Sequence, residues 1–194
     1  MTTQSINQVT EGSHMKSHRI ISHRVIALAA CGLLAACDSS TEPQPDLAAQ
    51  VRSETARFSA TSAAIEAGYE LEDHCVAHPD LGGMGYHWVN GPLIDTEFEA
   101  MRPEALLYER DGNGEFQLTG VEYIVIAAPG VALDGPARPD FDGHPFDIGG
   151  VPPLADAGVP HWSLHVWLHK DNPNGVFLPF NPSVSCAMSE GHSH

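Results

Sequence analysis

The run HWSLHVWLH, residues 161–169, places three histidines four residues apart in an otherwise apolar segment. Residues four apart share one face of a helix, and they also share one face of a strand, where alternate side chains point the same way. Leu164, Val166 and Leu168 alternate with the other residues, and the turn-forming sequence KDNPNG follows. This pattern predicts a strand. Its aliphatic face is expected to be core, and its other face carries His161, Ser163, His165, Trp167 and His169.

Three other segments have the composition of strands. They are residues 85–89 (GYHWV), 105–110 (ALLYER) and 116–127 (FQLTGVEYIVIA). The sequence RDGNGEF between the last two has the turn residues of a hairpin loop. Residues 129–160 are rich in Gly, Pro and Asp and show no periodicity, which indicates either a functional or a disordered segment.

Residues 46–67 have the apolar spacing of a helix, with Asp46 able to cap its start and Gly68 able to end it. The apolar stripe is thin and rich in alanine, so the helix is expected to lie on the domain rather than run through it. We expect an α+β fold: an N-terminal amphipathic helix packed on a mainly antiparallel β-sheet or small open barrel, in one domain with long ordered loops.

The first 36 residues have the features of a removable segment. GSHM at residues 12–15 looks like an expression-vector remnant, and a basic stretch and a short apolar stretch follow, as in a signal peptide. Residues 34–37 (LAAC) resemble the lipobox of bacterial lipoproteins, whose cysteine is acylated. We expect residues 1–36 to be removed, Cys37 to be lipidated, residues 37–45 to form a flexible tether and residues 46–194 a single globular domain. An ordinary secretory signal with an incidental cysteine is the alternative.

These features predict a cell-envelope protein, anchored by palmitate and other acyl chains and facing the periplasm or the exterior. The formal net charge of −16 disfavours nucleic acid and anionic membrane surfaces, and it is compatible with cations. We therefore expect membrane contact through the lipid anchor only and no nucleic-acid partner. Many secreted domains are acidic, so the charge by itself selects no function.

Cys75 and Cys186 are the two cysteines that lie beyond the lipobox. In an oxidising compartment two such thiols most simply form a disulfide. A Cys–His metal site is the alternative, because His74 and His78 flank Cys75.

Three polar residues stand in apolar strand sequences. Glu122 lies in VEYIVIA, where both faces are apolar, and a buried carboxylate must be paired, protonated or metal-bound. His87 lies in GGMGYHWV, whose glycines leave room for a ligand or for close backbone approach. His165 lies inside the run 161–169. Each alone is explained as readily by ordinary hydrogen bonding in the core or at the wet end of a strand.

Taken together, the three residues predict a metal site, because a small sheet can bring three strand positions onto one face. Two imidazoles and a carboxylate suit Zn²⁺, or Fe²⁺ in a facial triad, and a histidine-only subset would suit Cu²⁺. His161 and His169 could add a fourth ligand or orient the others, and His74 and His78 are further candidates.

The blocks GYELEDHCVAHPDLGGMGYHWVN, RPEALLYERDGNGEFQLTGVEYIV and LHVWLHKDNPNGVFLPFNPSVSC resemble those of an uncharacterised family of secreted bacterial proteins. The resemblance covers residues 56–186. In that family pattern the positions that match Cys75, His87, Glu122, His165 and Cys186 recur. The resemblance therefore supports the disulfide and the choice of metal ligands, and it implies no reaction.

Three classes of function are compatible with the sequence. The first is a lipid-anchored protein that binds a divalent transition metal through His87, Glu122 and His165. The second is a metalloenzyme, such as a hydrolase or an oxygenase, with residues 129–160 as the lid of its pocket. The third is an envelope interaction module in which the buried histidines serve packing only. A metal with an open coordination position in a deep pocket would favour the enzyme.

Overall fold

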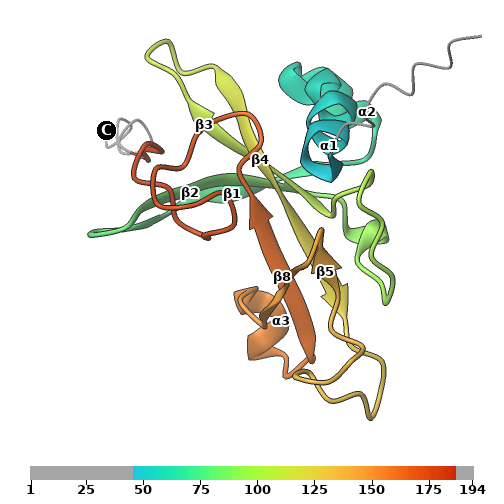
Figure 1. Cartoon of the computed structure of the whole chain (residues 1–194). Coiled ribbons are helices and arrows are strands. Elements are labelled where there is room, and N and C mark those ends of the chain that lie inside the picture. Colours follow the sequence, from blue (N-terminus) through green and yellow to red (C-terminus); the bar gives the residue numbers. More distant parts are fainter. Residues whose placement is uncertain (1–45, 187–194) are drawn as a thin grey trace, which may run out of the picture. The chain divides into compact units, whose positions relative to one another are not determined.

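Six antiparallel strands form the main sheet, in the order β1-β2-β3-β4-β8-β7 (Figure 1). The computed structural model describes residues 46–186. The strands of the sheet are β1 (Glu70–His78), β2 (Gly82–Val89), β3 (Ala105–Arg110), β4 (Phe116–Ile126), β7 (Asp147–Ile148) and β8 (His161–Val166). Because β1 and β7 lie at the two edges, this is an open sheet and not a barrel.

Short helices complete the fold, so the expectation of an α+β fold built on a mainly antiparallel sheet is confirmed. They are α1 (Leu47–Thr55), α2 (Thr61–Glu66) and α3 (Pro152–Asp156), with the 3-10 turns η1 (Ala56–Ser59) and η2 (Gly91–Leu93). The Asp46 side chain caps α1 by accepting a hydrogen bond from the amide of Ala49 at 2.7 Å.

Residues 46–67 form three pieces where the sequence predicted one helix. The chain turns into 3-10 geometry at Ala56, and Ala60 adopts an extended conformation. The carbonyl of Phe58, which a continuous helix would use internally, instead accepts a hydrogen bond from the Tyr108 hydroxyl at 2.6 Å. Phe58 is thereby held in the core against the sheet.

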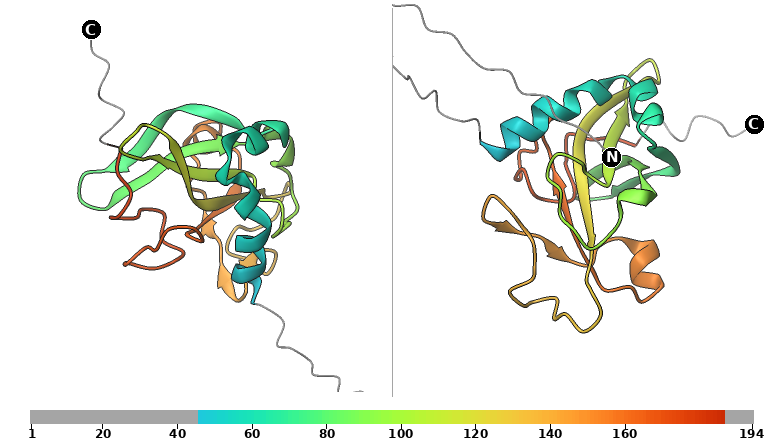
Figure 2. Two further views of the ribbon diagram at one scale, coloured as in Figure 1. Left: turned by 90° about the horizontal axis from the view of Figure 1, so that it is seen from above. Right: turned by 90° about the vertical axis from the view of Figure 1, so that its right-hand side faces the viewer.

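The two faces of the sheet are covered differently. One face carries the large aromatic and aliphatic side chains, among them Tyr86, Tyr108 and Tyr123, and it packs in one core with Val51 and Phe58 from the N-terminal helices. The other face carries Glu122 and its strand partners, and its own small cluster joins Leu107 and Trp167 to Val184 of the C-terminal segment. Figures 1 and 2 show the helices α1 and α2 and the C-terminal segment (red) against different parts of the sheet.

The C-terminal segment is fixed to β1 and β2. Cys75 and Cys186 form a disulfide with Cα atoms 5.7 Å apart, so the predicted bridge is confirmed and the alternative Cys–His metal site is wrong. The amide of Gly83 donates to the carbonyl of Asn181 at 3.1 Å, and the amide of Asn181 donates back at 3.0 Å. A Cβ atom at Gly82 would lie 2.3 Å from the Asn181 carbonyl oxygen. Glycine at this position therefore serves close backbone approach.

Residues 129–160 contain more structure than their sequence indicated. They include β5 (Asp140–Phe141), β6 (His144–Pro145), β7 and α3. Phe141 and Phe146 from this segment are buried in the core and contact Tyr123. These side chains pack against the sheet from irregular backbone. Their spacing along the sequence therefore shows neither the period of a helix nor that of a long strand.

Among residues 46–186 there is no helix long and apolar enough to cross a membrane. The predicted signal peptide (residues 1–36), the lipidation site Cys37 and the tether (residues 37–45) lie outside the described residues.

Candidate metal centre

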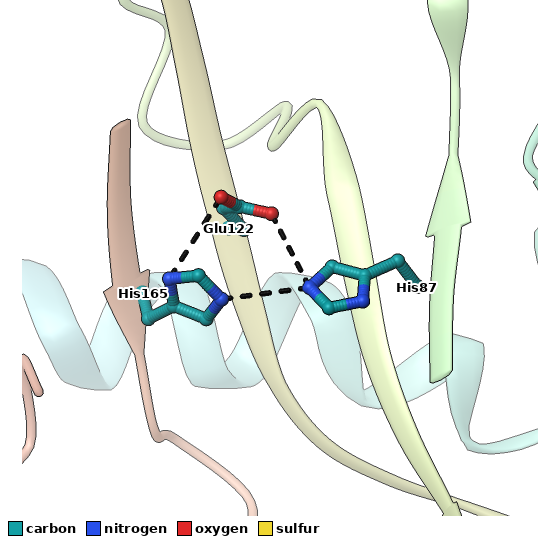
Figure 3. Close-up of side chains that lie close together, drawn as sticks. All are labelled: His87, Glu122 and His165. Atoms are coloured by element: carbon teal, nitrogen blue, oxygen red, sulfur yellow. Dashed lines mark hydrogen bonds and ion pairs between the residues drawn. The ribbon is translucent and has the colours of Figure 1, made fainter. Parts of the chain in front are cut away.

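His87 of β2, Glu122 of β4 and His165 of β8 meet on one face of the sheet (Figure 3). His87 Nε2 lies 3.5 Å from Glu122 Oε2 and 3.5 Å from His165 Nε2. His165 Nδ1 lies 3.8 Å from Glu122 Oε1. Each residue offers one nitrogen or oxygen atom, and these three atoms all lie within 4.8 Å of one another. The predicted meeting of these three side chains is therefore confirmed.

Strand register explains why they meet. Glu122 stands directly opposite His165, so the two side chains are neighbours on adjacent strands. β3 separates β2 from β4, and its residue opposite Glu122 is Ala105. The β3 residue opposite His87 is Leu107, so His87 and Glu122 are diagonal neighbours that reach each other over β3, across about 10 Å of sheet. The short side chain of Ala105 leaves space on the Glu122 side of this path.

Burial sets the protonation of the cluster. The exposed fractions are 7% for His87, 4% for Glu122 and 5% for His165. Desolvation lowers the pKa of His87 to about 4, with a smaller contribution from His74. Desolvation also lowers the pKa of His165 to about 3, aided by His87. Both rings are thus neutral at neutral pH, which is the state that binds a metal.

Glu122 is the unusual member of the cluster. Desolvation, together with smaller contributions from Glu72 and Glu104, raises its pKa to about 8. No Lys or Arg among the described residues contacts it. Basic side chains form their ion pairs elsewhere: Lys170 with Glu109 at 2.5 Å, and Arg102 with Glu99 at 2.6 Å. A carboxylate in this place therefore needs either a proton or a metal cation.

The direct contacts within the cluster are too long to be good hydrogen bonds for its three buried side chains. Charge-assisted N–H···O hydrogen bonds are typically about 2.7–2.9 Å long, whereas these contacts are 3.5 and 3.8 Å. The Nδ1 atom of His87 is buried without a hydrogen-bond partner. Tetrahedral bonds of about 2.0–2.1 Å would place ligand atoms roughly 3.3 Å apart. The two 3.5 Å distances from His87 Nε2 are close to that value, and the distance between His165 Nδ1 and Glu122 Oε1 is 3.8 Å, so the donor set suits a first-row metal ion.

All three residues line a pocket of about 650 Å³. Its walls come from β1, from the segment around α3 and from Phe180 of the C-terminal segment. On β1, residues 72–74 form a bulge, since Leu71 pairs with Trp88 while Cys75 pairs with Tyr86. The bulge directs Glu72 and His74 into the pocket beside His87.

His161, predicted as a fourth ligand or an orienting residue, holds the pocket wall instead. The amide of Val151 donates to His161 Nε2 at 3.1 Å, so Nδ1 carries the proton and donates to the Val159 carbonyl at 2.8 Å. Ser163 donates to the carbonyl of Gly149 at 2.7 Å. Both residues attach the segment before α3 to β8, and His161 has no ring nitrogen left for a metal.

His169 does not share the face of His165, because β8 ends at Val166. The amide of His169 bonds to the Thr119 carbonyl, and His169 Nε2 lies 2.9 Å from Thr55 Oγ1 of α1. Burial lowers the pKa of this ring, and Arg52 lowers it further. His78, the last residue of β1, packs against Phe180 of the C-terminal segment and is outside the cluster. Neither residue joins the metal centre.

Sequence reasoning named His74 only as a further candidate, and it missed Glu72 and the buried Glu104. The polar run at residues 70–74 concealed β1, and a bulge cannot be recognised without its partner strand. Glu104 accepts a hydrogen bond from the amide of Ile124 at 2.9 Å, and desolvation raises its pKa to about 8. The only available signal was a carboxylate directly before the apolar run ALLY.

Comparisons of the chain with family models, with curated proteins and with solved structures found no match. The resemblance to a family of secreted bacterial proteins therefore stays a prediction. The function must be inferred from the site itself.

Proposed function

We propose that the protein binds one divalent transition metal ion, Zn²⁺, Fe²⁺ or Cu²⁺, through His87, Glu122 and His165. The observation that carries the proposal is a buried carboxylate that has no Lys or Arg partner among residues 46–186 and faces two neutral imidazoles, with one ligand atom of each of the three residues within 4.8 Å of the others. Two imidazoles and one carboxylate are a common ligand set for zinc and for non-haem iron.

We also propose that the metal is bound at the bacterial cell envelope. The support is the lipobox-like sequence ending at Cys37 and the signal-like segment before it. In this proposal the lipid is the protein's only contact with the membrane, and the acidic domain faces the periplasm or the exterior. The high negative charge favours capture of cations from that space.

Elemental analysis of the purified full chain, produced without a His tag, tests metal binding. The chain is equilibrated with one metal at a time, passed through a desalting column and compared with His165→Ala and with His144→Ala. His144 is exposed and stacks on Phe177, so its substitution is a matched control. We expect one equivalent in the wild type and in His144→Ala, and little in His165→Ala. Equal metal in all three proteins would refute the site, because adventitious binding by the histidines of the C-terminal tail is common to all.

A metalloenzyme is the second candidate, and the pocket supports it. Three protein ligands leave at least one coordination position for water or substrate, and all three ligands line a pocket of about 650 Å³. Glu72 and His74 on the same wall are of the residue types that serve as general acid or base. Titrating the Co²⁺-loaded protein with imidazole distinguishes the two candidates. A shift of the visible bands reports an open position, whereas unchanged bands indicate a closed, binding-only site.

A further inference from the structure

The pocket above the metal centre has an unusual distribution of charge. Besides the metal ligand Glu122, its lining contains two carboxylates, Glu72 of β1 and Asp156 of α3. No Lys or Arg belongs to the lining that the structure describes. Glu72 is close enough to Glu122 to raise the pKa of that carboxyl group. With a divalent ion bound to Glu122, the two remaining carboxylates make the pocket net negative.

The rest of the wall is apolar. Val76, Met84, Val151, Pro152, Pro153 and Phe180 supply it. A pocket of this size and composition is typical of small-molecule sites, in which apolar walls hold the body of the ligand and a few polar groups fix its orientation. The polar groups here are the metal ligands on the sheet face, Glu72 and His74 on β1, and Asp156 on α3.

From this arrangement we infer that the pocket binds an organic cation, an amine with an apolar body, whose far end donates an oxygen or nitrogen atom to the metal. The ammonium group meets Glu72 and Asp156, and the apolar body packs against Met84, Phe180 and the prolines of α3. A ligand whose far end is anionic is disfavoured in this account, because the described lining has no Lys or Arg to pair with it and Glu72 and Asp156 would repel it. The inference rests on the proposed metal site and names its ligand class.

The local fold supports a role for Glu72 in binding the ammonium group of the ligand. It belongs to the bulge of β1, where three residues stand opposite His87, and bulges re-aim side chains next to functional sites. Glu70 on the same strand is exposed and does not line the pocket. Glu70→Gln therefore removes the same charge from the same strand without changing the pocket, and it is the control for Glu72→Gln.

Three hydroxamic acids of matched length test the inference: hexanohydroxamic acid, 6-aminohexanohydroxamic acid and the monohydroxamate of adipic acid. All three present the same metal-binding group, and their far ends are neutral, cationic and anionic. Binding to the Zn²⁺-loaded full chain is measured by calorimetry at pH 8, where ordinary imidazoles are uncharged. We expect the amine to bind at least about tenfold more tightly than the carboxylate, with the neutral compound between them.

The variants distinguish the effect of the pocket carboxylates on ligand affinity from the effect of the protein's overall negative charge. Glu72→Gln and Asp156→Asn are each expected to reduce the ratio of amine to carboxylate affinity by about threefold or more, while Glu70→Gln leaves it unchanged. Metal content is measured first for every protein. If the wild type holds Zn²⁺ but the carboxylate binds as well as the amine, if none of the probes binds, or if Glu70→Gln acts like Glu72→Gln, the inference is overturned and the metal site stands. If the wild type holds no metal, both fail.

Discussion

Replacing Glu122 with glutamine keeps the shape of the side chain and removes its charge, so it should affect the metal-free and metal-loaded proteins in opposite ways. Burial raises the pKa of Glu122 from 4.5 to about 8. Without metal, the folded protein therefore keeps a proton that the unfolded chain releases above pH 4.5. The free energy of unfolding falls as the pH rises from 4.5 towards 8, by about 1.4 kcal/mol per pH unit, and at pH 7 the loss is at most about 3.5 kcal/mol.

Glutamine does not titrate, so Glu122→Gln should escape this loss. In EDTA at pH 7 we expect the variant to be more stable than the wild type by up to about 3.5 kcal/mol, with a difference that grows from pH 5 to pH 8. The two histidines have lowered pKa values, so they destabilise the fold as the pH falls below 6.5. This second effect is common to both proteins and cancels in the difference.

Bound metal should make the wild type more stable than Glu122→Gln, which is the reverse of the order in EDTA. A ligand at 100 times its Kd stabilises the folded state by about 2.7 kcal/mol. The wild type should gain this increment with Zn²⁺, and Glu122→Gln should lose most of it, because a neutral amide is a poor substitute for a carboxylate ligand.

Urea unfolding followed by tryptophan fluorescence, in EDTA and in Zn²⁺, measures all four values. Glu115→Gln, at an exposed position of the β3–β4 loop, is the control and should match the wild type. If Glu122→Gln is destabilised in EDTA and gains as much from Zn²⁺ as the wild type does, then Glu122 is a hydrogen-bonded structural residue and the proposed metal site is wrong.

Three further predictions use other parts of the chain. His165→Ala should lose at least about 100-fold in Zn²⁺ affinity by competition with a chelating dye, whereas His169→Ala, whose ring bonds to Thr55, should lose almost none; equal losses would contradict the assigned ligands. Replacing both Cys75 and Cys186 with serine should cost about 4–5 kcal/mol of unfolding free energy at most, since the bridge spans 111 residues, and an unchanged urea midpoint would contradict a stabilising bridge. Cys37→Ser should abolish labelling of the protein by palmitate in a bacterial host, and undiminished labelling would rule out this lipidation site.

The three ligands of the site could be predicted from the sequence, but the pocket around them could not. Glu122 and His165 could be identified because a charged or polar residue in an apolar strand needs a partner, and His87 because it lies inside a glycine-rich strand. Their convergence depends on register and on the order of the strands, neither of which a periodic pattern encodes. For the same reason His169 was placed on the wrong face: alternation gives no sign that β8 ends at Val166.

The pocket was even harder to predict from the sequence than the meeting of the ligands. Glu72 and His74 face it because of a bulge, and α3 reaches it because His161 and Ser163 attach residues 149–151 to β8. These are consequences of irregular backbone, which single-sequence patterns do not describe. The disulfide, by contrast, followed from simple counting once an oxidising compartment was assumed.

Anomalous diffraction at the zinc absorption edge, from crystals of the chain grown with one equivalent of Zn²⁺, tests the central claim most directly. We predict one strong peak about 2.0–2.2 Å from His87 Nε2, from a Glu122 carboxylate oxygen and from a ring nitrogen of His165, with further density on the pocket side. A peak at the histidines of the C-terminal tail instead, or no peak between β2, β4 and β8, would contradict it.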